Sequence, residues 1–118
     1  MQMMKMEIQD TTIILVYRSP SFHRHKQFQE ELVKLIPERG QVIVCGDFNI
    51  YPNDKDNHYE TLLAAMASKG LHQLVDKATH NKGHILDHLY VRDIDNPSWI
   101  FHYPYYSDHE AICFMAEL

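Results

Sequence analysis

The sequence predicts an α/β domain that contains one mixed β-sheet with helices on one face. Predicted strands alternate with predicted helices along the chain, which is typical of this class. The 118 residues suffice for one compact domain and are too few for two, so residues 1–118 are expected to form a single domain. A hydrophobic content of 45%, with 23% charged residues, is ordinary for a globular protein.

The N-terminal third of the chain predicts a strand followed by a helix. Residues 11–17 are β-branched, aromatic and almost entirely apolar, which indicates the first strand. A helix is predicted over residues 23–36, because apolar side chains recur there at helical spacing. Pro37 and Gly40 are expected to end this helix.

The remaining elements follow the same alternation and then change to strands alone. Residues 41–46 predict a second strand, and a polar loop over residues 47–57 follows it. Residues 58–69 predict a second helix that stops at Gly70. Three further strands are then predicted, over residues 85–91, 99–103 and 111–117.

The predicted strands are apolar on both faces of their pleat, as residues 42–45 (Val-Ile-Val-Cys) illustrate. Such strands need cover on both sides. Two helices can cover one face, so we expect the other face to pack on a second sheet from another segment or subunit. The alternative is that an unrecognised helix, or the loops, cover it.

Composition excludes some functional classes. A net charge of −5 argues against a domain that grips nucleic acid by charge alone, but it is compatible with a metal-dependent site. No apolar run approaches the roughly 20 residues of a membrane helix, and the N-terminus lacks the apolar stretch of a signal peptide. Cys45 and Cys113 lie in apolar runs and are expected to be buried free thiols, which suits an intracellular, reducing compartment.

Polar residues at the end of the second strand are the first candidate site. Asp47 and Asn49 follow a buried strand directly, where catalytic groups collect in α/β folds. A carboxylate beside an amide can hold a water molecule and a phosphate oxygen together. The alternative is that both residues only form a turn.

Each of three other motifs is, by itself, weak evidence for a functional site. Residues 107–109 (Ser-Asp-His) could bind a metal and a phosphate, or could lie on the surface. Asp87 lies among apolar neighbours and needs a partner, such as a histidine that it would orient, or a salt bridge. Tyr17 and Arg18 could bind a phosphate, or could be a core tyrosine and a surface arginine.

Together these motifs are specific. In chain order they are Tyr-Arg-Ser-Pro at 17–20, Gly-Asp-Phe-Asn at 46–49, Leu-Asp-His at 86–88 and Ser-Asp-His at 107–109. The series resembles the second half of the exonuclease-endonuclease-phosphatase superfamily, which includes deoxyribonuclease I and the apurinic-site endonucleases. Residues 79–88 and 105–109 are most similar to the endonuclease domains of mobile elements, both non-long-terminal-repeat retrotransposons and Helitron-like elements.

The resemblance implies catalytic roles at the ends of the first two predicted strands. Asp47 would be the base or the carboxylate that positions water, and Asn49 would orient the water and the phosphate. Tyr17 would contact the phosphate or assist the leaving group. Arg18 is a candidate phosphate ligand on the chemistry of its side chain alone.

The resemblance also implies roles for the later motifs. Asp108 would help bind a magnesium or manganese ion, and a lone ligand there would hold it weakly. His109 would contact the scissile phosphate and stabilise its developing charge, with Asp87 orienting the imidazole. These roles meet the needs of phosphodiester cleavage, which are an in-line water and stabilisation of negative charge.

The resemblance covers half of a domain. Members of the superfamily form a four-layer α/β/β/α sandwich, and their first half contains a glutamate that is a principal metal ligand. This half is absent here: Glu7 precedes the first predicted strand and does not match that glutamate. The chain is therefore expected to form half of the sandwich, with an incomplete site and a bare sheet face that a homodimer or a complementing first-half segment would cover.

Three functions remain open at this stage. The first is a magnesium-dependent phosphodiesterase of endonuclease type that acts on DNA, located in the nucleus if it derives from a eukaryotic mobile element. The second is a non-catalytic fragment that acts as a dimerising or binding module. The third is a phosphodiesterase for another substrate, such as a phosphoinositide or a small nucleotide.

Overall fold

The computed structural model describes six segments of the chain. They are residues 2–19, 24–50, 57–74, 87–94, 98–102 and 111–115, with side chains described at 2–19, 24–50, 57–74 and 88–94. Five strands form the main sheet in the order β1-β2-β3-β5-β4. They are β1 (Gln2–Ile8), β2 (Thr11–Tyr17), β3 (Gln41–Asp47), β4 (His72–Gln73) and β5 (Asp87–Arg92).

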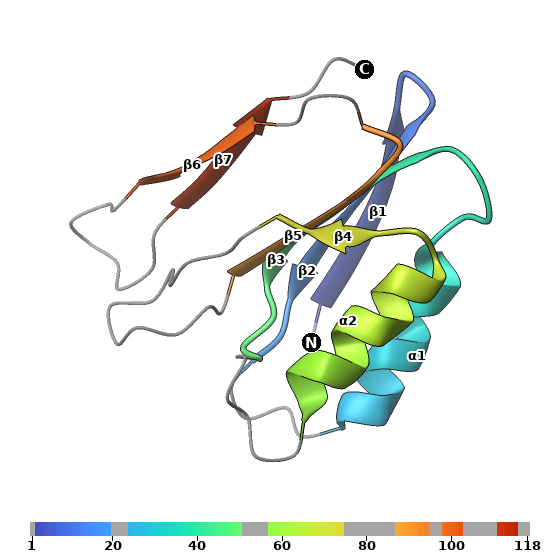
Figure 1. Cartoon of the computed structure of the whole chain (residues 1–118), viewed down its shortest axis with the longest axis vertical. Coiled ribbons are helices and arrows are strands. Elements are labelled where there is room, and N and C mark those ends of the chain that lie inside the picture. Colours follow the sequence, from blue (N-terminus) through green and yellow to red (C-terminus); the bar gives the residue numbers. More distant parts are fainter. Residues whose placement is uncertain are drawn as a thin grey trace.

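The sheet is mixed, because β2 and β3 run parallel while the other neighbouring pairs run antiparallel. Helices α1 (His25–Leu35) and α2 (His58–Ser68) lie side by side against one face of it (Figure 1). The predicted α/β class, with one mixed sheet and helices on one face, is confirmed. Strands β6 (Ser98–His102) and β7 (Ala111–Met115) pair in a separate two-stranded sheet.

The boundaries of the predicted elements agree with the structure within the described residues. Strand β2 has the predicted bounds, β3 extends one residue further to Asp47, and both helices lie inside their predicted ranges. Helix α2 ends as its sequence predicts, because Gly70 takes a positive φ of 80°. The N–H groups of Gly70 and Leu71 then bond back to the carbonyls of Ala67 and Met66, each at 2.9 Å.

Two strands were not predicted. Strand β1 pairs with β2 through a two-residue turn in which Gln9 and Asp10 both have positive φ, at 48° and 66°. Its composition is rich in methionine and polar residues, so it lacks the β-branched pattern of a strand. Glu7 consequently lies inside β1, whereas the sequence placed it before the first strand. Strand β4 has only two residues, too few to show a pattern.

The helix-covered face contains the main core. Side chains of β2, β3 and β5 pack there against α1 and α2, and the buried members include Ile14, Val44, Phe28, Leu62 and Tyr90. Each fully buried large apolar side chain contributes about 1.5–3 kcal/mol to stability. This packing fixes the helices on the sheet and, with them, the loops at the ends of β2 and β3.

The opposite face is covered in part. At β3 and β5, Ile43 and Leu89 are buried within the chain, so the expectation that this whole face is bare is wrong there. Figure 1 shows the β6–β7 hairpin on this side of the sheet, away from the helices. At β1 and β2 the face remains open: Met4 is 59% exposed and Leu15 is 40% exposed. These two residues lie opposite each other in the β1–β2 register and line a shallow groove of about 630 Å³.

Candidate active site at the ends of β2, β3 and β5

Three residues predicted to be catalytic occupy one row across the sheet. Tyr17 is the register partner of Asp47 in the parallel pair β2–β3. Asp47 is in turn the partner of Asp87 in the antiparallel pair β3–β5. Residues that are 30 and 40 positions apart in the chain (17, 47 and 87) therefore lie on adjacent strands at one end of the sheet. The phenol of Tyr17 is accessible, since the residue is 47% exposed.

Gly46 allows the two parallel strands to approach closely just before the row. Its φ is 144°, and a Cβ atom there would overlap the backbone carbonyl oxygen of Val16. Beyond the row, the N–H of Arg18 donates to the carbonyl of Asp47 at 2.8 Å and extends the ladder by one bond. Strand β3 ends at Asp47, and residues 48–50 follow it outside the sheet.

Asp47 and Asn49 form a local turn that presents both side chains together. The backbone N–H of Asn49 donates to Oδ1 of Asp47 at 3.1 Å, and Asn49 has a left-handed φ of 50°. The side-chain amide of Asn49 donates to the carbonyl of Arg18 at 2.5 Å. The turn-forming alternative is thus correct as a description of the backbone. It does not compete with catalysis, because a carboxylate can accept about four hydrogen bonds.

Arg18 points into the protein. The residue is 2% exposed, and its Nη1 donates to the carbonyls of Phe48 at 3.2 Å and Asn49 at 3.0 Å. Its Nη2 lies 2.8 Å from Nε2 and 3.1 Å from Nδ1 of His25. The guanidinium carbon lies 5.7 Å from the centre of the Phe28 ring. The alternative of a surface arginine is therefore wrong, and the phosphate-binding role of Arg18 stays a prediction.

His88 holds the same segment from β5. It is fully buried, and its Nε2 lies 2.9 Å from the carbonyl oxygen of Ile50, an acceptor to which the ring must donate. Its Nδ1 lies 3.0 Å from the hydroxyl of Tyr90 and accepts from it in the neutral tautomer. Burial raises the pKa of Tyr90 far above its usual range, with a smaller contribution from Tyr59, so the hydroxyl remains a donor. The imidazole stacks on Phe48 with ring centres 4.5 Å apart.

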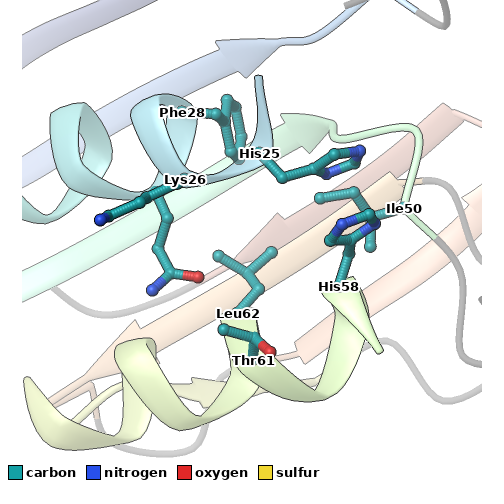
Figure 2. Close-up of a pocket in the computed structure, with 8 residues that line it drawn as sticks. His25, Lys26, Phe28, Ile50, His58, Thr61 and Leu62 are labelled. Atoms are coloured by element: carbon teal, nitrogen blue, oxygen red, sulfur yellow. The ribbon is translucent and has the colours of Figure 1, made fainter. Parts of the chain in front are cut away.

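A small cavity adjoins the site at the N-termini of α1 and α2. Its volume is about 220 Å³, and its lining includes His25, His58, Phe28 and Ile50. Figure 2 shows His25 and His58 reaching toward each other from the two helices. Their rings stack with centres 3.4 Å apart and planes 6° apart. Sequence reasoning missed both histidines, because each opens its helix and only the packing of the helices brings them together.

The other predicted site residues lie outside the described part of the chain. Asp108 and His109 belong to an undescribed segment, and Asp87 is placed only by its backbone. Among the residues with described side chains, no group of three His, Cys, Asp or Glu residues could hold a metal ion. Asp47 offers one carboxylate, and magnesium is usually bound by one or two carboxylates together with substrate oxygens. Within the same residues, no helix is long and apolar enough to cross a membrane.

Comparisons with known proteins show the family and the fold of the chain. A family model described as endonuclease-reverse transcriptase matches residues 11–113. The endonuclease domain of TRAS1, a telomere-specific non-LTR retrotransposon, superimposes with a TM-score of 0.72 at 18% identity, over 95% of this chain and 59% of that one. An endonuclease/exonuclease/phosphatase family protein from Leptotrichia buccalis C-1013-b gives a TM-score of 0.59 at 19% identity, over 97% of this chain and 52% of that one.

The chain spans little more than half the length of both solved structures, and at these identities they establish the fold alone. No curated protein matches the chain.

Proposed function

The chain belongs to the endonuclease-reverse transcriptase family, and from this premise we propose that it contains part of the active site of a magnesium- or manganese-dependent endonuclease that cuts DNA. Its fold is that of the exonuclease-endonuclease-phosphatase domains, including one from a mobile element. The observation that best supports the proposal is the row of Tyr17, Asp47 and Asp87 on three adjacent strands, with Asn49 bound beside it.

The described residues could position the attacking water and contact the phosphate during hydrolysis. Asp47 would accept a proton from the attacking water or hold that water in line with the phosphorus. Asn49, fixed by its bond to the Arg18 carbonyl, would orient the same water and a phosphate oxygen. The exposed Tyr17 would donate a hydrogen bond to the phosphate or to the leaving oxygen.

The later motifs would complete the chemistry. Asp87 would orient His109, whose imidazole would contact the scissile phosphate. Asp108 would be a metal ligand, and a magnesium or manganese ion held there would offset negative charge on the phosphate. These three roles rest on the family resemblance and on the register position of Asp87.

DNA is the substrate we favour. The family model and the TRAS1 domain are both of endonuclease type. The chain's net charge of −5 means that binding would depend on the metal and on site contacts more than on a basic surface. A phosphoinositide or a small nucleotide remains the alternative substrate class, and competition assays with these compounds would reveal it.

We further propose that the open part of the second sheet face is an interface. Met4 and Leu15 are apolar, exposed and adjacent on β1 and β2. The chain covers only 59% and 52% of the two solved structures, so a complementing first-half segment or a second copy of this chain would cover that surface. In a solution of the purified chain, only a second copy of the chain is present to cover this surface.

Plasmid nicking tests the proposed activity. The purified chain with magnesium should nick supercoiled DNA, while the D47A and H109A variants should not and E30A, at an exposed position of α1, should remain active. Equal nicking by D47A would identify a contaminant. The alternative is a non-catalytic fragment that acts as a dimerising or binding module. If the chain cuts no DNA and magnesium titration gives no heat signal, the non-catalytic function is favoured.

A further inference from the structure

We propose that Arg18 is a positioning residue, which fixes the segment from Asp47 to Asn49 through its backbone and does not contact the phosphate. The proposal deepens the proposed function, on which it rests for the view that Asp47 and Asn49 are active-site residues. It replaces the phosphate-binding role that the sequence suggested for Arg18.

Arg18 forms hydrogen bonds with three consecutive residues, Asp47, Phe48 and Asn49. Its backbone N–H donates to the carbonyl of Asp47, and its Nη1 donates to the carbonyls of Phe48 and Asn49. Its own carbonyl accepts the side-chain amide of Asn49. One residue at the end of β2 therefore determines where the backbone after β3 runs and where the Asn49 amide points.

The burial of the guanidinium argues against a phosphate contact. At 2% exposure, its Nη1 and Nη2 atoms lie within hydrogen-bond distance of carbonyl oxygens and of the imidazole of His25, and its guanidinium carbon lies over the face of Phe28. Hydrogen bonds from a charged donor are worth more than neutral ones, and breaking them in a buried place leaves unsatisfied carbonyls. If the guanidinium moved outward to a phosphate, its contacts with the carbonyl oxygens, His25 and Phe28 would be lost.

A second anchor acts on the same segment from the opposite side. The Nε2–H of His88 donates to the carbonyl of Ile50, and its ring stacks on Phe48. The carbonyls of residues 48, 49 and 50 thus all accept from buried side chains, two from Arg18 and one from His88. Anchoring from β2 and β5 holds Asn49 in its left-handed conformation, which asparagine tolerates better than most residues.

The variant R18K separates positioning from phosphate binding. Lysine keeps the positive charge, but its single ammonium on a flexible stem cannot reproduce a planar fork that spans two carbonyls and an imidazole. R39K is the matched control, because Arg39 is an exposed arginine that follows α1.

Hydrogen exchange provides a readout that does not need catalysis. In R18K, the amide of Asn49 should exchange at least about tenfold faster, while the amide of Val44 inside β3 stays unchanged. Unchanged exchange at Asn49 would overturn the proposal. Equal acceleration at both amides would also overturn it, because Arg18 would then support the whole fold.

The wild-type chain offers a second test that does not depend on the folding of a variant. A guanidinium anchored on both sides should give separate, slowly exchanging Nη signals in nitrogen-15 spectra, unaffected by added inorganic phosphate. A single averaged signal, or one that shifts with phosphate, would contradict a positioning role.

Kinetics then connect the proposal to the reaction. If the chain nicks DNA, R18K should lower kcat by up to about 10²-fold with little change in KM, as expected when catalytic groups are misplaced. A phosphate ligand would instead raise KM and reduce the salt slope of DNA binding by about one when its charge is removed in R18Q. If no variant or wild-type chain cuts DNA, the activity proposal fails, and the exchange result still decides the role of Arg18.

Discussion

Gly46 lies so close to Val16 that a Cβ atom at residue 46 would overlap the carbonyl oxygen of Val16 and lie 2.8 Å from its carbonyl carbon. We therefore expect G46A to push β2 and β3 apart and destabilise the fold by about 3 kcal/mol or more. Chemical denaturation would measure the loss. In the control G40A, a Cβ would meet nothing within 4 Å, so only backbone strain of about 1 kcal/mol should appear. Equal losses in the two variants would contradict the clash.

Arg92 joins the ends of both helices to the sheet. Its guanidinium donates to the carbonyls of Pro37 at 2.7 Å, Lys69 at 2.8 Å and Gly40 at 3.0 Å. Since R92K would leave most of these partly buried carbonyls without a donor, it should lower the free energy of unfolding by about 1–3 kcal/mol. Thermal unfolding would show this loss, and R39K, at an exposed arginine, should change little.

The Cys45 thiol makes stability fall at alkaline pH. Burial raises its pKa from 9.0 to about 11. Between these values the unfolded chain loses the proton and the folded chain keeps it, so stability is complete below pH 9 and declines as pH rises toward 11. The loss should be about 2–3 kcal/mol.

Denaturation of C113S at pH 8 and at pH 11 would measure the Cys45 contribution, and the double variant C45A/C113S should lack it. In native C113S, thiol reagents at pH 8 should also react more slowly than with the unfolded chain. Rapid native labelling would show that Cys45 is accessible.

The open sheet face should control association. Light scattering of the purified chain at micromolar concentration should give a dimer if a second copy covers Met4 and Leu15. The L15K variant should then be a monomer that retains its fold, because Leu15 is already 40% exposed. A64K places the same charge on an exposed position of α2 and should remain dimeric. A folded wild-type monomer would rule out the second copy as partner.

Local pattern explains why much of the site was predictable. The ends of β2 and β3 follow from apolar runs that stop at polar residues, and these ends place Tyr17 and Asp47. Parallel pairing of the two strands then makes them neighbours. By contrast, nothing local distinguishes an arginine directed inward from one directed to solvent. The position of Arg18 depends on carbonyls 30 and 31 residues away.

The sequence by itself determined the class of the domain, its two helices, its main strands and the residues that stand at the ends of β2 and β3, because apolar periodicity and turn chemistry act over a few residues. Only the tertiary structure decided the pairing of β1, the partial cover of the second face, the stacking of His25 on His58 and the anchoring by Arg18 and His88. Each of these depends on groups far apart in the chain, whose approach follows from packing the whole core. The motif at residues 46–49 marks the candidate site, and long-range contacts hold its backbone in place.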